Sequence, residues 1–156
     1  MGPLAELRVV ELAHIMAGPV CGRMLADLGA DVVKVERLPE GDTSRSFVPP
    51  AQDGQSAAFL MLNRNKRGIA VDLKAPEGLE IARRLLARAD VVIENYRAGV
   101  MERLGLGYDA LRRENRGLIY CEISGFGRTG PFADRGGVDL IAQGYAGHMS
   151  ITGEGP

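Results

Sequence analysis

The acidic residue best placed for chemistry in this sequence is Asp139, which follows two glycines and precedes an apolar, helix-capable segment, residues 140–146. Glycine allows a backbone to approach a ligand closely, and loops carried by a rigid scaffold often hold reactive groups. A carboxylate at this position can act as a nucleophile, and it can equally cap the N-terminus of the helix that follows. The local pattern leaves both roles open.

The segments that must position this loop alternate between short apolar runs and helical patterns. β-Branched and apolar runs predict strands at residues 8–12, 31–36, 68–73, 91–95 and 118–123. Apolar residues at helical spacing predict helices at residues 20–28, 57–62, 76–89, 100–104 and 108–114. Residues 37–55, rich in Pro, Gly, Ser and Asp, predict a long loop. This alternation predicts a doubly wound, mostly parallel, Rossmann-like α/β sheet with helices on both faces.

Sheets of this kind bind ligands outside the carboxyl ends of their strands. The turn after the first strand lacks the G-x-G-x-x-G pattern, which argues against a nicotinamide or flavin dehydrogenase. Neither a G-x-S-x-G elbow nor P-loop spacing occurs, so a serine nucleophile and phosphoryl transfer from ATP are also disfavoured. At the end of the second strand, Glu36 could hold a ribose hydroxyl and Arg37 could bind a phosphate.

The composition and charge of the chain narrow the possible binding partners, metal sites and cellular location. The net charge of −1 and the pI near 6.1 give no electrostatic case for nucleic acid or an anionic membrane. Two basic clusters, residues 64–67 and 83–88, are predicted to be solvated faces. Cys21 and Cys121 are expected to be a reduced pair, and two histidines are too few for a metal site. With no signal-peptide pattern and no apolar run that spans a bilayer, we expect a cytoplasmic protein.

Taken together, the motifs resemble those of the class III CoA-transferase family, which also contains the α-methylacyl-CoA racemases. The resemblance runs from Leu7 to Glu154 and rests on these segments in order: LRVVELAHIMAGPVCGRMLADLGADVVKVER, GDTSR, NRNKRGIAVDLKAPEG, ADVVIENYRAGVMERLGLGYD, LIYCEISGFGRTGP and GVDLIAQGYAGHMSITGE. It implies that residues 1–156 form one CoA-binding α/β domain, the N-terminal part of the family's large domain, in a truncated chain. The resemblance also implies that residues 1–156 do not include the family's second, smaller domain.

The resemblance also implies residue roles. Asp139 matches the family's aspartate nucleophile, and no metal ligand is implied. The remaining matches are to CoA-binding positions: His14, Ile15 and Ala17 at the thioester end, Arg37 near the adenosine phosphate end with Val71 and Lys74 close by, and Asn95, Tyr96 and Arg103 as further contacts. No permanently bound cofactor is expected, because coenzyme A enters as a thioester substrate.

The implied activity is transfer of CoA from an acyl-CoA to a carboxylic acid, through an aspartyl anhydride and an aspartyl-CoA thioester. The alternative within the family is racemisation of a 2-methylacyl-CoA, which needs a base on each face of the α-carbon. Racemases of the family carry a histidine just before the aspartate, where this chain has Val138. Another alternative is a CoA-binding fragment without catalysis.

Met16 stands where oxalate-specific relatives carry glutamine, and a thioether is a weak hydrogen-bond partner. The expected partners are an acyl-CoA, a carboxylic acid and a second copy in an interlocked homodimer.

Overall fold

The computed structural model describes residues 2–154, and the chain divides into two compact units. The first unit extends through Ile123, and the second begins at Ser124. The predicted single domain, residues 1–156, includes Met1 and residues 155–156, which lie outside the described residues. No helix in residues 2–154 has the length and apolar character needed to cross a membrane.

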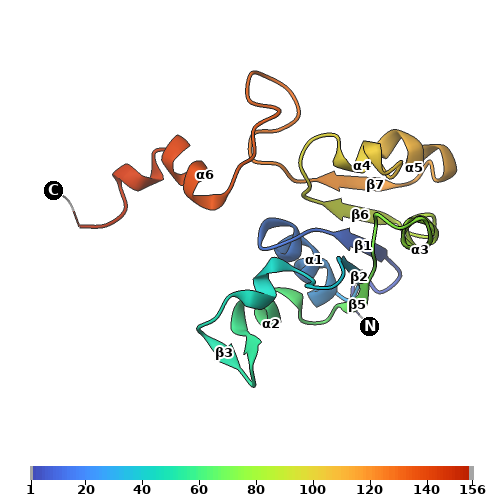
Figure 1. Ribbon diagram of the computed structural model, residues 1–156, viewed down its shortest axis with the longest axis horizontal. Helices are drawn as coiled ribbons and strands as arrows, with labels where there is room; N and C mark the ends of the chain where they lie inside the picture. Colours follow the sequence, from blue (N-terminus) through green and yellow to red (C-terminus); the bar gives the residue numbers. More distant parts are fainter. Residues whose placement is uncertain (1, 155–156) are drawn as a thin grey trace. The chain divides into compact units, whose positions relative to one another are not determined.

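The first unit is built on a five-stranded sheet in the order β5-β2-β1-β6-β7, with every neighbouring pair parallel (Figure 1). The strands are β1 (Arg8–Leu12), β2 (Asp31–Glu36), β5 (Arg67–Ala70), β6 (Val91–Glu94) and β7 (Ile119–Glu122). From β1 the chain moves outward to β2 and β5, and it then returns to the other side of β1 for β6 and β7. This reversal confirms the predicted doubly wound α/β fold and places its switch point between β1 and β6.

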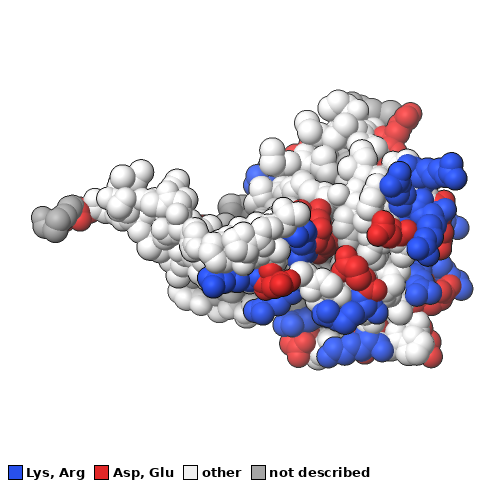
Figure 2. Space-filling model, turned by 90° about the horizontal axis from the view of Figure 1, so that it is seen from above, with Lys and Arg blue, Asp and Glu red and all other residues white. Residues whose placement is uncertain are grey.

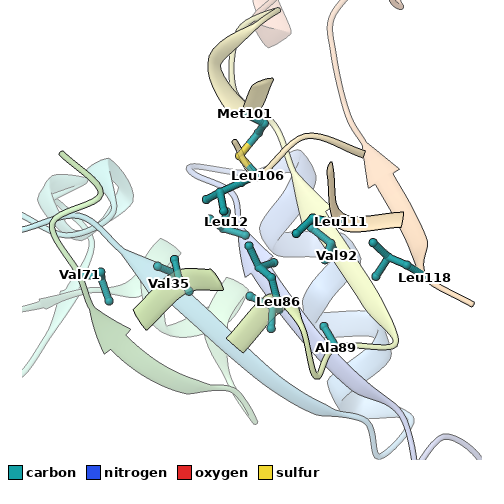
Figure 3. Packing of buried hydrophobic residues seen from close by; sticks show 12 residues of the cluster. Leu12, Val35, Val71, Leu86, Ala89, Val92, Met101, Leu106, Leu111 and Leu118 are labelled. Atoms are coloured by element: carbon teal, nitrogen blue, oxygen red, sulfur yellow. The ribbon is translucent and has the colours of Figure 1, made fainter. Parts of the chain in front are cut away.

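Helices cover both faces of this sheet, as the apolar strands predict. The helices are α1 (Ala17–Asp27), α2 (Ala57–Asn63), α3 (Pro76–Leu86), α4 (Val100–Arg103) and α5 (Tyr108–Glu114). Alternate residues of β1 point to opposite faces, so Val10 belongs to one core cluster and Val9 to the other. The first cluster packs β-strand side chains such as Val92 against Leu86 of α3 and Leu111 of α5 (Figure 3). The second packs the opposite face against α1.

The predicted elements occur in the expected order, and several of their bounds differ. α1 begins at Ala17, before the predicted start at Val20, so Pro19 lies inside its first turn, where its missing N–H costs no hydrogen bond. β5 ends at Ala70, short of the predicted Leu73. The predicted loop contains a 3₁₀ turn, η1 (Thr43–Ser46), and a hairpin of β3 (Ala51–Gln52) and β4 (Gln55–Ser56).

The second unit consists of a glycine-rich loop followed by α6 (Asp139–Tyr145) and η2 (His148–Ser150). The backbones of Gly125 and Gly137 meet so closely that a Cβ on Gly125 would lie 2.4 Å from the Gly137 Cα. Three aromatic rings, those of Phe126, Phe132 and Tyr145, pack edge to face or tilted with centroids 5.3–5.6 Å apart. Close backbone contact and aromatic packing therefore define the loop that leads into α6.

Basic side chains on the first unit gather over the end that α3 and α5 form, with acidic side chains among them (Figure 2). Arg83, Arg84 and Arg88 are exposed, which confirms the predicted solvated face. The other basic cluster does not follow the prediction throughout. Arg67 is exposed, whereas the Lys66 side chain retains only 2% of its accessible surface and pairs with a buried carboxylate. The solvated-face prediction is wrong for Lys66, because sequence composition does not register a distant buried partner.

Candidate functional site

The switch point of the sheet brings together the loops that follow β1 and β6. The His14 N–H donates to Asn95 Oδ1 at 2.9 Å, and the Asn95 side-chain amide donates to the His14 carbonyl oxygen at 2.9 Å. The Tyr96 ring contacts the His14 ring edge to face, with centroids 5.1 Å apart. Three of the residues predicted to bind CoA therefore form one hydrogen-bonded and stacked group in the place where open α/β sheets hold their ligands.

Burial makes both rings of this group neutral near pH 7. It lowers the pKa of His14 below its ordinary value of 6.5, and the nearby Asp42 carboxylate only partly opposes this. Burial and the Glu94 carboxylate raise the pKa of the Tyr96 phenol to about 12. The site consequently offers a neutral imidazole and a protonated phenol, which can make hydrogen bonds to a polar ligand without attracting a counter-charge.

The turn between β1 and α1 has a conformation that few side chains adopt. Ile15 has a φ of 67°, in the left-handed region that β-branched residues disfavour, and its N–H donates to both Asp42 carboxylate oxygens at 3.0 and 3.3 Å. Ala17, which the resemblance placed at the thioester end, is the exposed first residue of α1. The turn that matches the thioester-binding segment is thus fixed by a carboxylate that arrives from another loop.

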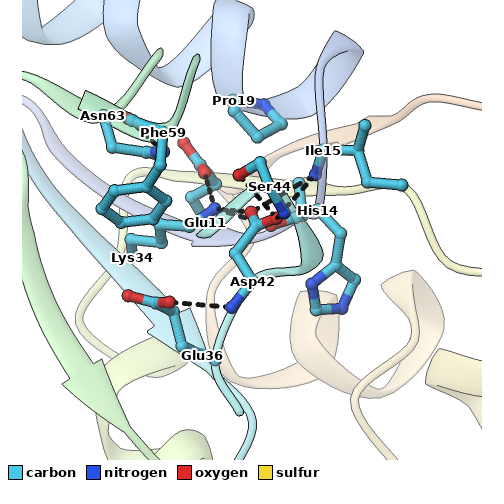
Figure 4. A network of polar contacts seen from close by, with 12 residues as sticks. Glu11, His14, Ile15, Pro19, Lys34, Glu36, Asp42, Ser44, Phe59 and Asn63 are labelled. Carbon is cyan, nitrogen blue, oxygen red and sulfur yellow. Dashed lines mark hydrogen bonds and ion pairs between the residues drawn. The ribbon is translucent and has the colours of Figure 1, made fainter. Parts of the chain in front are cut away.

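Beneath this turn lies a buried network of four charged side chains (Figure 4). Lys34 Nζ lies 2.8 Å from a carboxylate oxygen of Glu11, 2.8 Å from one of Asp42, and 2.8 Å from the Ala13 carbonyl oxygen. Lys66 Nζ lies 2.7 Å from the other Glu11 carboxylate oxygen, Oε2. This contact is an ion pair whose angles do not make a hydrogen bond. The side chains of Glu11 and Asp42 are fully buried. Two cations balance two carboxylates, as a buried ionic group requires.

Sequence reasoning did not single out Glu11, Lys34 or Asp42, although one signal was available. Glu11 and Lys34 interrupt strands that are otherwise apolar and were expected to be covered on both faces. A charged residue in such a strand must find a buried partner, because burying a lone charge is prohibitive. α1 is adapted to this group as well: a Cβ on Gly22 would lie 1.9 Å from Glu11 Oε2.

The other predicted CoA-binding residues of the first unit follow the carboxyl ends of β2, β5 and β6. Arg37 follows β2, is exposed, and donates from Nε to the Gly41 carbonyl oxygen at 3.2 Å. Val71 follows β5 and is buried in the core, while the Lys74 side chain is exposed. Arg103 is the exposed last residue of α4, which follows β6. All of these loops leave the same edge of the parallel sheet.

Glu36 is not available for the ribose-binding role considered from the sequence. Arg45 donates two hydrogen bonds to its carboxylate, each 2.7 Å long, and the Asp42 N–H donates a third at 2.9 Å. Burial raises the pKa of Glu36, but these bonds outweigh burial and the pKa is lowered overall. Glu36 therefore anchors the loop that carries Asp42, and Arg37 remains as the exposed polar residue at the end of β2.

In the second unit, Asp139 is the exposed first residue of α6. The N-cap is Val138, and no side chain caps the helix, so the alternative that Asp139 serves as the N-cap is wrong. The Asp139 carboxylate accepts a hydrogen bond from the Gln143 side-chain amide one turn later. Within residues 2–154, no cluster of His, Cys, Asp or Glu is placed to hold a metal ion.

Acidification is expected to destabilise the first unit through Asp42. Burial raises the pKa of Asp42, but hydrogen bonds from Lys34, Ser44 and Ile15 outweigh it and lower the pKa to about 2, from an ordinary value of 3.8. A lowered folded-state pKa stabilises the fold above the unfolded-state value, and the contribution is lost as the pH falls from about 4 to 2. We expect a loss of about 1.5 kcal/mol between pH 5 and pH 2.5, roughly two-thirds of the full contribution of about 2.5 kcal/mol. Urea unfolding at pH 5 and pH 2.5 measures it, and an Asp42→Asn variant with an unchanged difference between the two pH values would contradict the assignment.

Comparison with known proteins places this geometry in context. The model of CoA-transferase family III matches residues 4–156. A succinate–glutarate CoA-transferase from Agrobacterium fabrum is 53% identical over 97% of this chain and 40% of its own length. The mouse succinyl-CoA:glutarate CoA-transferase is 45% identical over 98% of this chain and 35% of its own. The crystal structure of a CAIB/BAIF family protein from Brucella suis, 52% identical, superposes with a TM-score of 0.92 over 98% of this chain and 41% of that one. The chain thus spans well under half the length of these relatives.

Proposed function

The chain belongs to CoA-transferase family III, and on that premise we propose that it carries the CoA-binding loops and the nucleophile of an enzyme that transfers CoA from an acyl-CoA thioester to a carboxylic acid. Asp139 is the proposed nucleophile. The proposed CoA-binding residues are those of the first unit that match the family: His14, Ile15, Ala17, Arg37, Val71, Lys74, Asn95, Tyr96 and Arg103.

The observation that carries this proposal is the group at the switch point. His14 and Asn95 exchange two hydrogen bonds of 2.9 Å, and the Tyr96 ring packs on His14. His14 is far from Asn95 and Tyr96 in sequence, and it was matched to the family in a different motif. Their meeting at the ligand-binding edge of a doubly wound sheet is the arrangement that a shared role in binding requires.

The proposed chemistry is an exchange of acyl bonds at Asp139. Its carboxylate attacks the thioester carbonyl and expels CoA thiolate, which leaves a mixed anhydride between the donor acid and the aspartate. The thiolate then attacks the aspartyl carbonyl and releases the donor acid, which leaves an aspartyl-CoA thioester. The acceptor carboxylate attacks the carbonyl of this thioester and expels CoA thiolate, which leaves a second mixed anhydride between the acceptor and Asp139. The thiolate then attacks the acceptor carbonyl, forms the new acyl-CoA and releases the Asp139 carboxylate. Each intermediate keeps the acyl-transfer potential of the original thioester.

Negative charge that develops on the attacked carbonyl oxygen needs hydrogen-bond donors. We assign this role to backbone N–H groups near Gly136 and Gly137 or at the start of α1, where glycine or a helix terminus leaves N–H groups accessible. An oxyanion donor of this kind contributes about 3–4 kcal/mol in other enzymes.

For substrates, we propose succinyl-CoA as donor and a larger dicarboxylic acid as acceptor. The two curated relatives compared above are named for succinate or succinyl-CoA and for glutarate. Met16 is 54% exposed at the turn after β1, and its thioether cannot offer a small dicarboxylate such as oxalate a strong hydrogen bond. An apolar, flexible side chain there suits a longer carbon chain better.

The test uses the complete product of the gene that encodes this chain. Acyl-CoA donors are screened against a panel of carboxylic acids, with succinyl-CoA and glutarate among them, and CoA ester products are measured by mass spectrometry. Incubation with acyl-CoA and then hydroxylamine or borohydride is expected to modify Asp139, and peptide mapping locates the adduct. Absence of transfer with every donor, or an adduct on a different residue, would contradict the proposal.

Racemisation is disfavoured by the residue before the nucleophile. Val138 is an exposed aliphatic side chain at the N-cap of α6, and it cannot remove or return a proton. We therefore expect no exchange at the α-carbon of a 2-methylacyl-CoA. Deuterium incorporation from D₂O during incubation with the complete gene product is the direct measurement, and rapid wash-in would favour the racemase instead.

Three expectations from the sequence stay predictions. The resemblance implies that residues 1–156 act as a single CoA-binding domain and that the protein forms an interlocked homodimer, and the lack of a signal-peptide pattern predicts a cytoplasmic location. Calorimetry of the 156-residue chain with CoA separates a competent binding domain from a fragment without function. Light scattering of the complete gene product gives its mass in solution. Cell fractionation tests the location.

A further inference from the structure

The turn between β1 and α1 is held in a conformation that its own sequence does not favour. Ile15 lies in the left-handed region at a φ of 67°, where a β-branched side chain collides with its own backbone. Such outliers persist only when surrounding groups hold them, and they concentrate at functional sites. In this structure the Ile15 N–H is directed at the Asp42 carboxylate (Figure 4).

Asp42 is itself fixed by more contacts than a loop residue needs. Its carboxylate accepts hydrogen bonds from the Ser44 N–H and the Ser44 hydroxyl, both 2.9 Å long, in addition to the bond from Ile15. Lys34 supplies a buried positive charge at 2.8 Å. The Asp42 N–H is bound in turn by Glu36 at 2.9 Å. Asp42 is 1% exposed, so it is positioned to act on the turn and not on a bound ligand.

We propose that Asp42 is a positioning residue for acyl-CoA, which holds Ile15 in the left-handed conformation and so fixes the turn from His14 to Ala17 in its binding geometry. This inference rests on the proposed function of that turn in CoA binding. An asparagine has the same shape but only one acceptor oxygen, whereas the carboxylate serves Lys34 on one oxygen and Ser44 on the other, with Ile15 between them. Both the charge and the second acceptor are therefore required.

The first experiment observes the turn in the unmodified 156-residue chain. By NMR, the Ile15 amide proton is expected far downfield and protected from exchange with solvent, because it donates to a buried carboxylate. In Asp42→Asn the same proton is expected to move upfield and exchange faster. A wild-type Ile15 amide that exchanges as fast as an unstructured one would overturn the proposal without reference to any ligand.

The second experiment measures the affinity of the complete gene product for CoA by calorimetry. Asp42→Asn is expected to weaken binding about tenfold or more, since a charged hydrogen bond that holds the turn is lost. Asp90→Asn is the matched control, because the Asp90 carboxylate also accepts a backbone N–H, that of Arg8 at 2.9 Å, but at the start of β1 and not at the turn that follows it. We expect this control to bind CoA within about twofold of wild type. Equal weakening in both variants would indicate a general loss of structure and contradict a specific role for Asp42.

A rescue variant separates positioning from simple destabilisation. Glycine adopts the left-handed conformation without strain, so a turn with Ile15→Gly needs the Asp42 carboxylate less. Asp42→Asn is therefore expected to weaken CoA binding by less than threefold in the Ile15→Gly background, against about tenfold in wild type. If Asp42→Asn weakens CoA binding as much in the Ile15→Gly background as in wild type, the proposal is overturned. A complete gene product that does not bind CoA contradicts the proposed function itself, whereas wild-type binding with unaffected Asp42→Asn contradicts only the role of Asp42.

Discussion

Replacing Asp139 by asparagine is expected to reduce CoA transfer by the complete gene product at least about 1,000-fold, because an amide cannot form the anhydride or the aspartyl-CoA thioester. The substitution keeps the size of the side chain, and Asp139 is exposed at the start of α6. The free energy of unfolding is therefore expected to change by less than about 0.5 kcal/mol. Initial rates with succinyl-CoA and a dicarboxylic acid measure the loss of transfer. Urea unfolding followed by circular dichroism measures the free energy of unfolding.

Asp134 provides a matched control for this variant. It is an exposed carboxylate of the same glycine-rich loop, five positions before Asp139. Asp134→Asn is expected to retain transfer within about threefold, since a surface carboxylate away from the reacting atoms contributes little. Retained activity in Asp139→Asn, or an equal loss in Asp134→Asn, would remove Asp139 from the mechanism.

The largest expected effect on stability comes from Glu11→Gln. Glu11 holds both buried lysines, Lys34 at 2.8 Å and Lys66 at 2.7 Å, and it is itself fully buried. Its neutralisation leaves two buried cations with one carboxylate. Breaking a buried ion pair in this way costs about 3–5 kcal/mol. We therefore expect Tm to fall by roughly 10 °C, measured by differential scanning calorimetry.

An exposed pair on α3 serves as the control for this substitution. Glu80 and Arg84 form a salt bridge of 2.8 Å one helical turn apart, with side chains 52% and 77% exposed. Glu80→Gln is expected to cost no more than about 0.5 kcal/mol, because solvent screens the pair. A loss from Glu11→Gln as small as the loss from Glu80→Gln would mean that water reaches the network and that its charges are not buried in solution.

Much of the scaffold could be predicted from local sequence, because apolar periodicity and terminal signals act over a few residues. β1, β2 and α5 have the predicted bounds, and Ser56 caps α2 by accepting a hydrogen bond from the Phe59 N–H at 3.3 Å. Apolar strands on both sides of α1 required a sheet covered on two faces. The motifs of the family then identified candidate residues at the strand ends, without revealing what supports them.

The sequence by itself thus determined the element order, the doubly wound class and Asp139 as the candidate nucleophile. Only the tertiary structure decided how the turn after β1 is held. Glu11 and Lys34 are paired across β1 and β2 by the parallel register, and Asp42 and Lys66 reach the same place from other loops. The register between strands and the positions of loops from distant parts of the sequence depend on non-local contacts, so no local pattern encodes them. The left-handed Ile15 follows from that network, because a buried carboxylate holds a conformation that isoleucine alone would leave.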